Sequence, residues 1–156
     1  MATNDKLVEV LNDLVQINND RITGYEKAVD ETKDLDVDLQ GIFRKMADES
    51  RGYKTELSQE IGRLGGEMAE GTTNMGKIYR VWMDVKATFT GHDRQSVLES
   101  CEFGEDAAQK AYREALASDA EMSADTRQLI TSQQSSLKTS HDMIKKLRDA
   151  HKAVNA

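Results

Sequence analysis

Apolar side chains recur at steps of three and four residues along four long segments of the chain, which is the spacing of one face of an α-helix. The pattern predicts helices over about residues 4–34, 36–64, 93–117 and 123–152. Most of the stability of such a helix comes from burying its apolar face against a neighbour. The four stripes therefore predict a common core enclosed by four helices.

The links between these segments indicate how the helices are connected. Few residues join the first segment to the second, or the third to the fourth, so each pair should fold back as an antiparallel hairpin. Gly65 and Gly66 are expected to end the second helix, because glycine adopts left-handed backbone angles freely. Ser123 precedes the fourth helix and is a favourable N-cap residue.

The connection between the two hairpins, residues 65–92, is long enough to return along the whole bundle. Within it, Ile78, Trp82, Val85 and Phe89 follow steps of four, three and four, which predicts a short amphipathic helix. Two hairpins joined by one long crossover have ferritin-like connectivity. The sequence thus predicts an all-α, ferritin-like four-helix bundle that forms a single domain over residues 1–156.

The composition agrees with an all-helical protein. The 156 residues include no proline, where average usage of about 5% would give roughly eight, so nothing forces a helix to break. Aromatic residues, which favour strands, make up only 5% of the chain. The length suits one domain.

Charge and hydropathy exclude several classes of partner and location. The net charge of −7 would repel nucleic acid, so we expect no nucleic-acid partner. No run approaches the roughly 18–20 apolar residues of a membrane span, and the first residues lack the apolar core of a signal peptide. A single cysteine, Cys101, fits a reducing compartment. We therefore expect a cytoplasmic protein without a membrane span.

Ionisable residues on the apolar stripes are the candidate functional groups, because burying them is costly without compensation. In bundles of this connectivity, such groups hold metal ions in the core. The candidate metal ligands are Glu49 on the second helix, Glu102 and Glu105 on the third, His141 on the fourth and, as a weaker candidate, Glu26 on the first.

The ligand set for a di-iron centre is incomplete. Such a centre needs two Glu residues and a Glu-x-x-His pair on each of the other two helices. Gly52 lies three residues after Glu49, and Lys138 lies three before His141, where the motif requires His and Glu. Two interpretations stay open: a mononuclear iron or manganese site, or a metal-free pairing of these side chains.

The positions of the candidate ligands along each hairpin show which of them could share an ion. Glu26 and Glu49 differ in level by about 7–8 Å at the helical rise of 1.5 Å per residue, too far for a shared ion. Glu102 and His141 differ by only about 4–5 Å, which long side chains can bridge.

No pattern of a catalytic site is present. Cys101 lies on the inner face of its helix, where cysteine behaves as a small hydrophobic residue. His92 and His151 fall near helix ends, which leaves little for a Ser-His-Asp relay. The glycines form no phosphate-binding loop after a strand. We therefore expect no catalytic and no cofactor-binding residues.

Three segments resemble a known bacterial family: QINNDRITGYEKA, the crossover GGEMAEGTTNMGKIYRVWMDVKATFTGHD and, most specifically, VLESCEFGEDAAQKAYREAL. The family is a ferritin-like four-helix-bundle family catalogued as a domain of unknown function, and the resemblance extends from about Leu7 to Arg148. It implies the topology described above and a bacterial, cytoplasmic origin, but no reaction, substrate or cofactor. The counterparts of ferritin ligands would be Glu26, Glu49 and Glu102 or Glu105, without the histidine of the second helix.

Two functions follow from these observations. The first is a non-catalytic interaction or stress-related protein that forms a homo-oligomer, with Ile78–Phe89 as a candidate surface for a protein partner. The alternative is a protein that binds iron or manganese through inward-facing Glu and His side chains.

Overall fold

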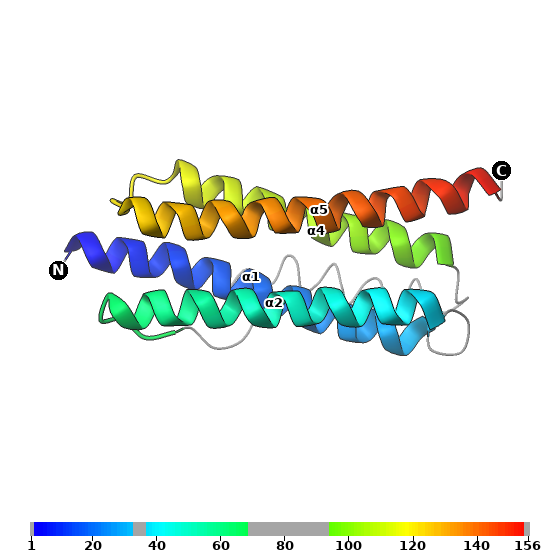
Figure 1. Cartoon of the computed structure of the whole chain (residues 1–156), viewed down its shortest axis with the longest axis horizontal. Helices are drawn as coiled ribbons and strands as arrows, with labels where there is room; N and C mark the ends of the chain where they lie inside the picture. Colours follow the sequence, from blue (N-terminus) through cyan, green and yellow to red (C-terminus); the bar gives the residue numbers. More distant parts are fainter. Residues whose placement is uncertain (1, 33–36, 69–93, 155–156) are drawn as a thin grey trace.

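The computed structural model describes residues 2–32, 37–68 and 94–154 and consists there of four α-helices without strands (Figure 1). The helices are α1 (Ala2–Thr32), α2 (Val37–Arg63), α4 (Arg94–Ala117) and α5 (Ala124–Val154). The predicted all-α bundle is confirmed, and each helix begins and ends within two residues of its predicted bounds. The short helix predicted over 78–89 lies outside the described residues.

The four helices are arranged as two antiparallel hairpins packed side by side. α1 packs against α2 and α4, and α5 packs against α4 and, less closely, against α2. α2 and α4 run in the same direction, so the end of α2 and the start of α4 lie at opposite ends of the bundle (Figure 1). This is the parallel relation that the long crossover predicts.

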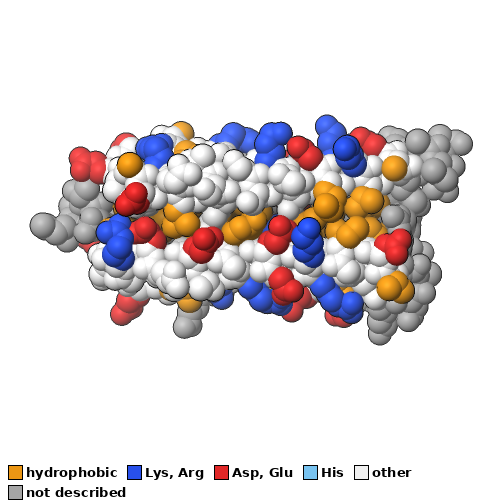
Figure 2. Space-filling model, viewed as in Figure 1, with side chains coloured by type: hydrophobic (Ala, Val, Ile, Leu, Met, Phe, Trp, Pro, Cys, Tyr) orange, Lys and Arg blue, Asp and Glu red, His pale blue; other side chains and the backbone are white. Residues whose placement is uncertain are grey.

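Apolar side chains line the boundary between α2 and α5, and charged side chains lie on either side of it (Figure 2). Each helix therefore turns one apolar stripe inward and a charged face outward, as its sequence predicts. None of the four helices is apolar enough over its length to cross a membrane.

The apolar core has two halves. One cluster is formed by Tyr25, Ala28, Leu39, Phe43, Met46, Ala47, Val97, Leu98, Cys101 and Ile144. The other is formed by Leu7, Leu11, Leu14, Val15, Leu57, Ile61, Tyr112, Ala115, Ala120, Ile130 and Leu137. Buried polar side chains, among them Asn18, Arg21, Ser50 and Glu105, lie between these clusters along the helices. We call this group of four the polar layer.

Two of the predicted helix ends are confirmed by their hydrogen bonds. The Ser123 hydroxyl accepts the Thr126 amide at 3.1 Å, as an N-cap does. At the end of α2, Gly65 has φ +81° and its amide donates to the Gly62 carbonyl at 3.0 Å. The Gly66 amide donates to the Ile61 carbonyl at 2.9 Å, which completes a Schellman motif.

Two glycine substitutions should change stability in opposite directions. Gly65→Ala places a Cβ atom at a left-handed position and should lower the free energy of unfolding by about 1–2 kcal/mol. Gly52→Ala, at an exposed helical position with no atom within 4 Å of the new Cβ, should raise it by about 0.5–1 kcal/mol. Urea denaturation of both variants measures the difference. Equal shifts of the same sign would contradict the described end of α2.

Candidate functional site

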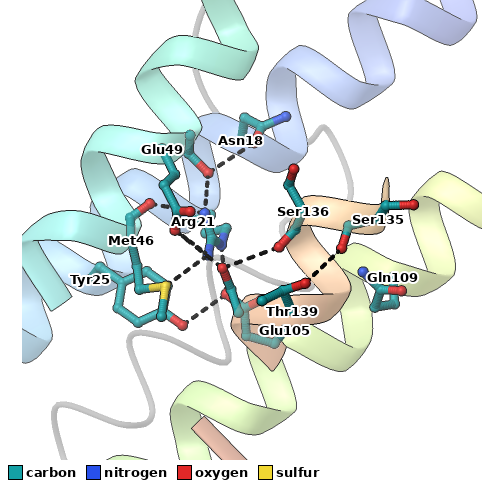
Figure 3. Close-up of polar contacts among 12 residues, drawn as sticks. Asn18, Arg21, Tyr25, Met46, Glu49, Glu105, Gln109, Ser135, Ser136 and Thr139 are labelled. Carbon is teal, nitrogen blue, oxygen red and sulfur yellow. Dashed lines mark hydrogen bonds and ion pairs between the residues drawn. The ribbon is translucent and has the colours of Figure 1, made fainter. Parts of the chain in front are cut away.

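A buried guanidinium lies at the centre of the polar layer (Figure 3). Arg21 of α1 is 2% exposed, and its Nε donates to Glu105 Oε1 of α4 at 2.5 Å. Its Nη1 donates to the Met46 carbonyl at 2.9 Å and to the Ser50 hydroxyl at 2.8 Å, both on α2. Its Nη2 lies 3.9 Å from Glu49 Oε1. One side chain thus connects three helices in the interior.

Tyr25 completes the surroundings of this ion pair. Its hydroxyl donates to Glu105 Oε1 at 2.7 Å, and its ring centroid lies 5.1 Å from Arg21 Cζ. That distance is typical of a cation–π contact. Glu105 is fully buried, and its Oε2 has no hydrogen-bond partner among the described residues. The hydrogen bonds from Arg21 and Tyr25 therefore both fall on one oxygen of the carboxylate.

The polar layer continues across the bundle through neutral side chains. Ser50 donates to Asn18 Oδ1 at 2.9 Å, and Asn18 Nδ2 donates to the Tyr112 hydroxyl at 2.9 Å. Tyr112 then donates to Gln133 Oε1 at 2.6 Å, and Gln133 Nε2 donates to the Tyr53 carbonyl at 3.2 Å. All four helices therefore contribute to one connected network, which is how buried polar groups avoid the penalty for being unpaired.

Electrostatics assign the charge of Arg21 and of two buried residues near it, Tyr25 and Cys101. Burial by itself lowers the pKa of Arg21, but the charge of Glu105, with Tyr25 and Glu49, raises it above its usual range overall. Burial and the nearby Glu105 carboxylate raise the pKa of Tyr25 and of Cys101 well above their ordinary values. The interior thus holds a charged guanidinium, a neutral phenol and a neutral thiol, in line with the inert Cys101 expected from the sequence.

The polar layer does not fit a core metal site. The Glu105 carboxylate is already bound by a cation, and Glu49 accepts a hydrogen bond from the Ser140 hydroxyl at 3.1 Å while facing the same guanidinium. A metal ion placed here would meet the positive charge of Arg21 at close range. The buried charge of Glu105 is therefore compensated by Arg21, and Glu49 faces the same guanidinium at a longer distance.

Glu26 lies on the surface instead of on the inner stripe expected for it. Its carboxylate is bound by Arg51 Nη2 at 2.8 Å, and both side chains are exposed. The physical reason is the turn of the helix: Tyr25 points into the core, and the next residue is rotated by about 100° from it.

A second ionisable group lies at the seam between α4 and α5. Glu102 and Asp106, one turn apart on α4, and His141 of α5 each offer a ligand atom within 4.8 Å of the others. His141 Nε2 lies 2.5 Å from Asp106 Oδ1, and its Nδ1 lies 3.1 Å from Asp142 Oδ1. Glu102 also accepts a hydrogen bond from Arg148. We call Glu102, Asp106 and His141 the seam triad.

The structure thus brings together two of the predicted candidates, Glu102 and His141, and leaves Glu49, Glu105 and Glu26 elsewhere. Asp106 was not among the predicted ligands, although its four-residue spacing from Glu102 places both on one helix face. Arg21 was not predicted either, although Asn18 and Arg21 continue the stripe of α1 between Leu14 and Tyr25 at helical steps.

The fold defines the class of protein. The chain has the ferritin-like four-helix architecture and is similar to a mutant of Mycobacterium smegmatis Dps1, a ferritin-like bundle, with a TM-score of 0.75. The alignment covers 94% of this chain and 97% of that chain at 10% sequence identity, so the likeness concerns the fold alone.

The family is shown by a separate comparison. The family model described as domain of unknown function (DUF2383) matches residues 6–118, and the chain belongs to this family. The resemblance stated from the sequence is thereby confirmed. Among curated proteins, none matches the chain.

Breaking the buried ion pair should be strongly destabilising. Arg21→Met leaves Glu105 as an unpaired buried charge and should lower the free energy of unfolding by about 3–5 kcal/mol. The double variant Arg21→Met/Glu105→Leu removes both charges and should recover a large part of that loss. Chemical denaturation of the wild type, of the single variants Arg21→Met and Glu105→Leu, and of the double variant gives the comparison. A double variant that is as unstable as the sum of the single changes would show that the two side chains are not coupled.

Proposed function

We propose that the protein is a non-catalytic ferritin-like bundle of the bacterial cytoplasm, which acts through contacts made by its surface in an interaction or stress-related role. The observation that carries this proposal is the guanidinium of Arg21, buried at the centre of the bundle against Glu105. In a di-iron bundle, the corresponding interior carries carboxylates and imidazoles that hold two cations. Here an arginine supplies the positive charge permanently.

The donor set of the interior supports the same conclusion. Among the side chains that the structure describes, only His141 carries an imidazole. This imidazole lies between α4 and α5, next to the exposed Asp106, and not in the core. A cation that displaced Arg21 would leave a buried guanidinium without its acceptors on α2 and α4. Such an unpaired buried charge is destabilising by several kcal/mol. The interior is therefore built to stay metal-free.

Self-association is the second part of this proposal. The ferritin-like neighbour has the same architecture, and the sequence predicts an amphipathic segment at Ile78–Phe89 in addition to the four stripes that the bundle buries. Residues 69–93 lie outside the described part of the chain, so this segment stays a predicted contact surface.

The proposal is tested with Fe²⁺ and with light scattering. The purified protein should not accelerate Fe²⁺ oxidation by oxygen, because no core site can bind the ion, and it should have a mass above that of one chain. The matched control is Glu114→Gln, which removes a carboxylate on the exposed face of α4. Oxidation that the protein accelerates and that Glu105→Gln abolishes, or a monomeric mass, would contradict the proposal.

A second candidate function is metal binding at the seam triad, which the convergence of two carboxylates and one imidazole favours. Oxygen and nitrogen ligands of this kind suit Mn²⁺, Fe²⁺ or Zn²⁺. The side chains of Glu102 and His141 are 12% and 16% exposed, and that of Asp106 is 61% exposed. An ion would therefore enter the site from solvent on the side of Asp106. Two ligands of this site, Glu102 and His141, belong to the predicted ligand set. The third, Asp106, does not.

Titration with Mn²⁺, followed through the electron paramagnetic resonance signal of the free ion, tests the seam triad. The wild type should bind one ion per chain, and His141→Ala or Asp106→Asn should weaken binding at least tenfold by removing a ligand. Glu114→Gln, on the same helix but outside the triad, should bind like the wild type. Binding of equal strength in all four proteins would rule out the seam triad as the site.

A further inference from the structure

Arg148 is the positively charged neighbour of the seam triad. His141 and Arg148 lie seven residues apart on α5, and Glu102 and Asp106 lie four apart on α4, so each pair shares a helix face. Across the seam, His141 faces Asp106 and Arg148 Nη1 donates to Glu102 Oε2. Glu102, a carboxylate that a bound ion would need, is therefore paired with the Arg148 guanidinium of the same chain.

We propose that Arg148 is an internal competitor of the metal ion, and that an ion gains Glu102 only when this guanidinium withdraws. This inference rests on the second proposed function, metal binding at the seam triad. A guanidinium and a divalent ion cannot share one carboxylate at close range without strong repulsion. The affinity for metal is then set by how readily Arg148 gives up Glu102.

The surroundings of Arg148 make this withdrawal feasible. Its Nε and Nη2 donate to Asp149 Oδ1 at 3.0 and 2.8 Å, so the guanidinium keeps a charged partner after it leaves Glu102. Its side chain is 25% exposed and reaches solvent without unfolding of the helix. Arg21 differs in both respects, because it is buried and all its acceptors lie inside the bundle.

The exchange has a consequence for the end of α5. In the metal-free protein, Arg148 joins the last turns of α5 to α4 through Glu102. Metal binding would transfer Glu102 to the ion and return Arg148 to solvent beside the exposed Lys145 and Lys146. The positive charge displayed by this part of α5 would then increase when the ion binds, which gives the surface a response to metal.

Mn²⁺ titration of Arg148→Gln against the wild type tests the proposal. Without Arg148 the ion no longer has to displace a guanidinium from Glu102, so binding should tighten roughly tenfold or more, as expected for the loss of a competing charge pair in a partly buried place. The matched control is Lys146→Gln, which removes an exposed positive charge from the same helix and should change affinity less than twofold. Circular dichroism verifies that all three proteins are folded.

A second measurement follows the guanidinium itself. In the wild type, addition of Zn²⁺ should shift the NMR signal of the Arg148 Nε–H group, and in His141→Ala it should not at the same concentration. Wild-type binding with an unchanged or weakened affinity in Arg148→Gln would overturn the competition while leaving the metal site intact. Absence of binding in both the wild type and Arg148→Gln would overturn the metal site and the competition together.

Discussion

The architecture depends on one buried ion pair, Arg21 with Glu105, placed between two apolar halves of the core. Transfer of a charge into the interior is expensive, and a buried pair is stable only when its geometry satisfies both partners. A shift of α1 along α4 by one turn, about 5.4 Å, would press the guanidinium against apolar side chains. The hydrogen bonds of Arg21 to α2 and α4 therefore require one relative register of the three helices. The hydrogen bonds of Asn18 and Ser50 extend the same constraint across the layer.

The sequence was sufficient for the four described helices and their relative directions, because the helices are encoded locally. Apolar spacing, a terminal glycine pair and a serine N-cap each act within a few residues, and the structure confirms Gly65 and Ser123 in these roles. The site was harder to predict because its geometry depends on distant residues. Arg21 and Glu105 lie 84 positions apart, and no local pattern assigns one to the other.

The predicted ligand Glu105 and the residue that faces His141, Asp106, are neighbours in the sequence, and this explains why the sequence predicted Glu105 instead of Asp106. Glu105 and Asp106 are neighbours in the sequence, but a rotation of about 100° per residue places Glu105 in the core and Asp106 at the surface. Helical periodicity locates a stripe to within about one residue, so it could not decide which of the two carboxylates faces His141. The same uncertainty put Glu26 on the inner stripe beside Tyr25.

Two of the arginine–glutamate pairs, Arg21 with Glu105 and Arg148 with Glu102, show how burial separates a fixed charge from one that can change partner. Arg21 is enclosed and holds acceptors on two other helices, so its release would require the core to open. Arg148 lies at the seam and has Asp149 as an alternative partner, so its release requires only a change of side-chain position. A fold shared with another ferritin-like protein at 10% identity does not carry that protein's chemistry with it. Among the described residues, the arginine of these two pairs that can change partner without opening the core is therefore the one that lies where α4 meets α5.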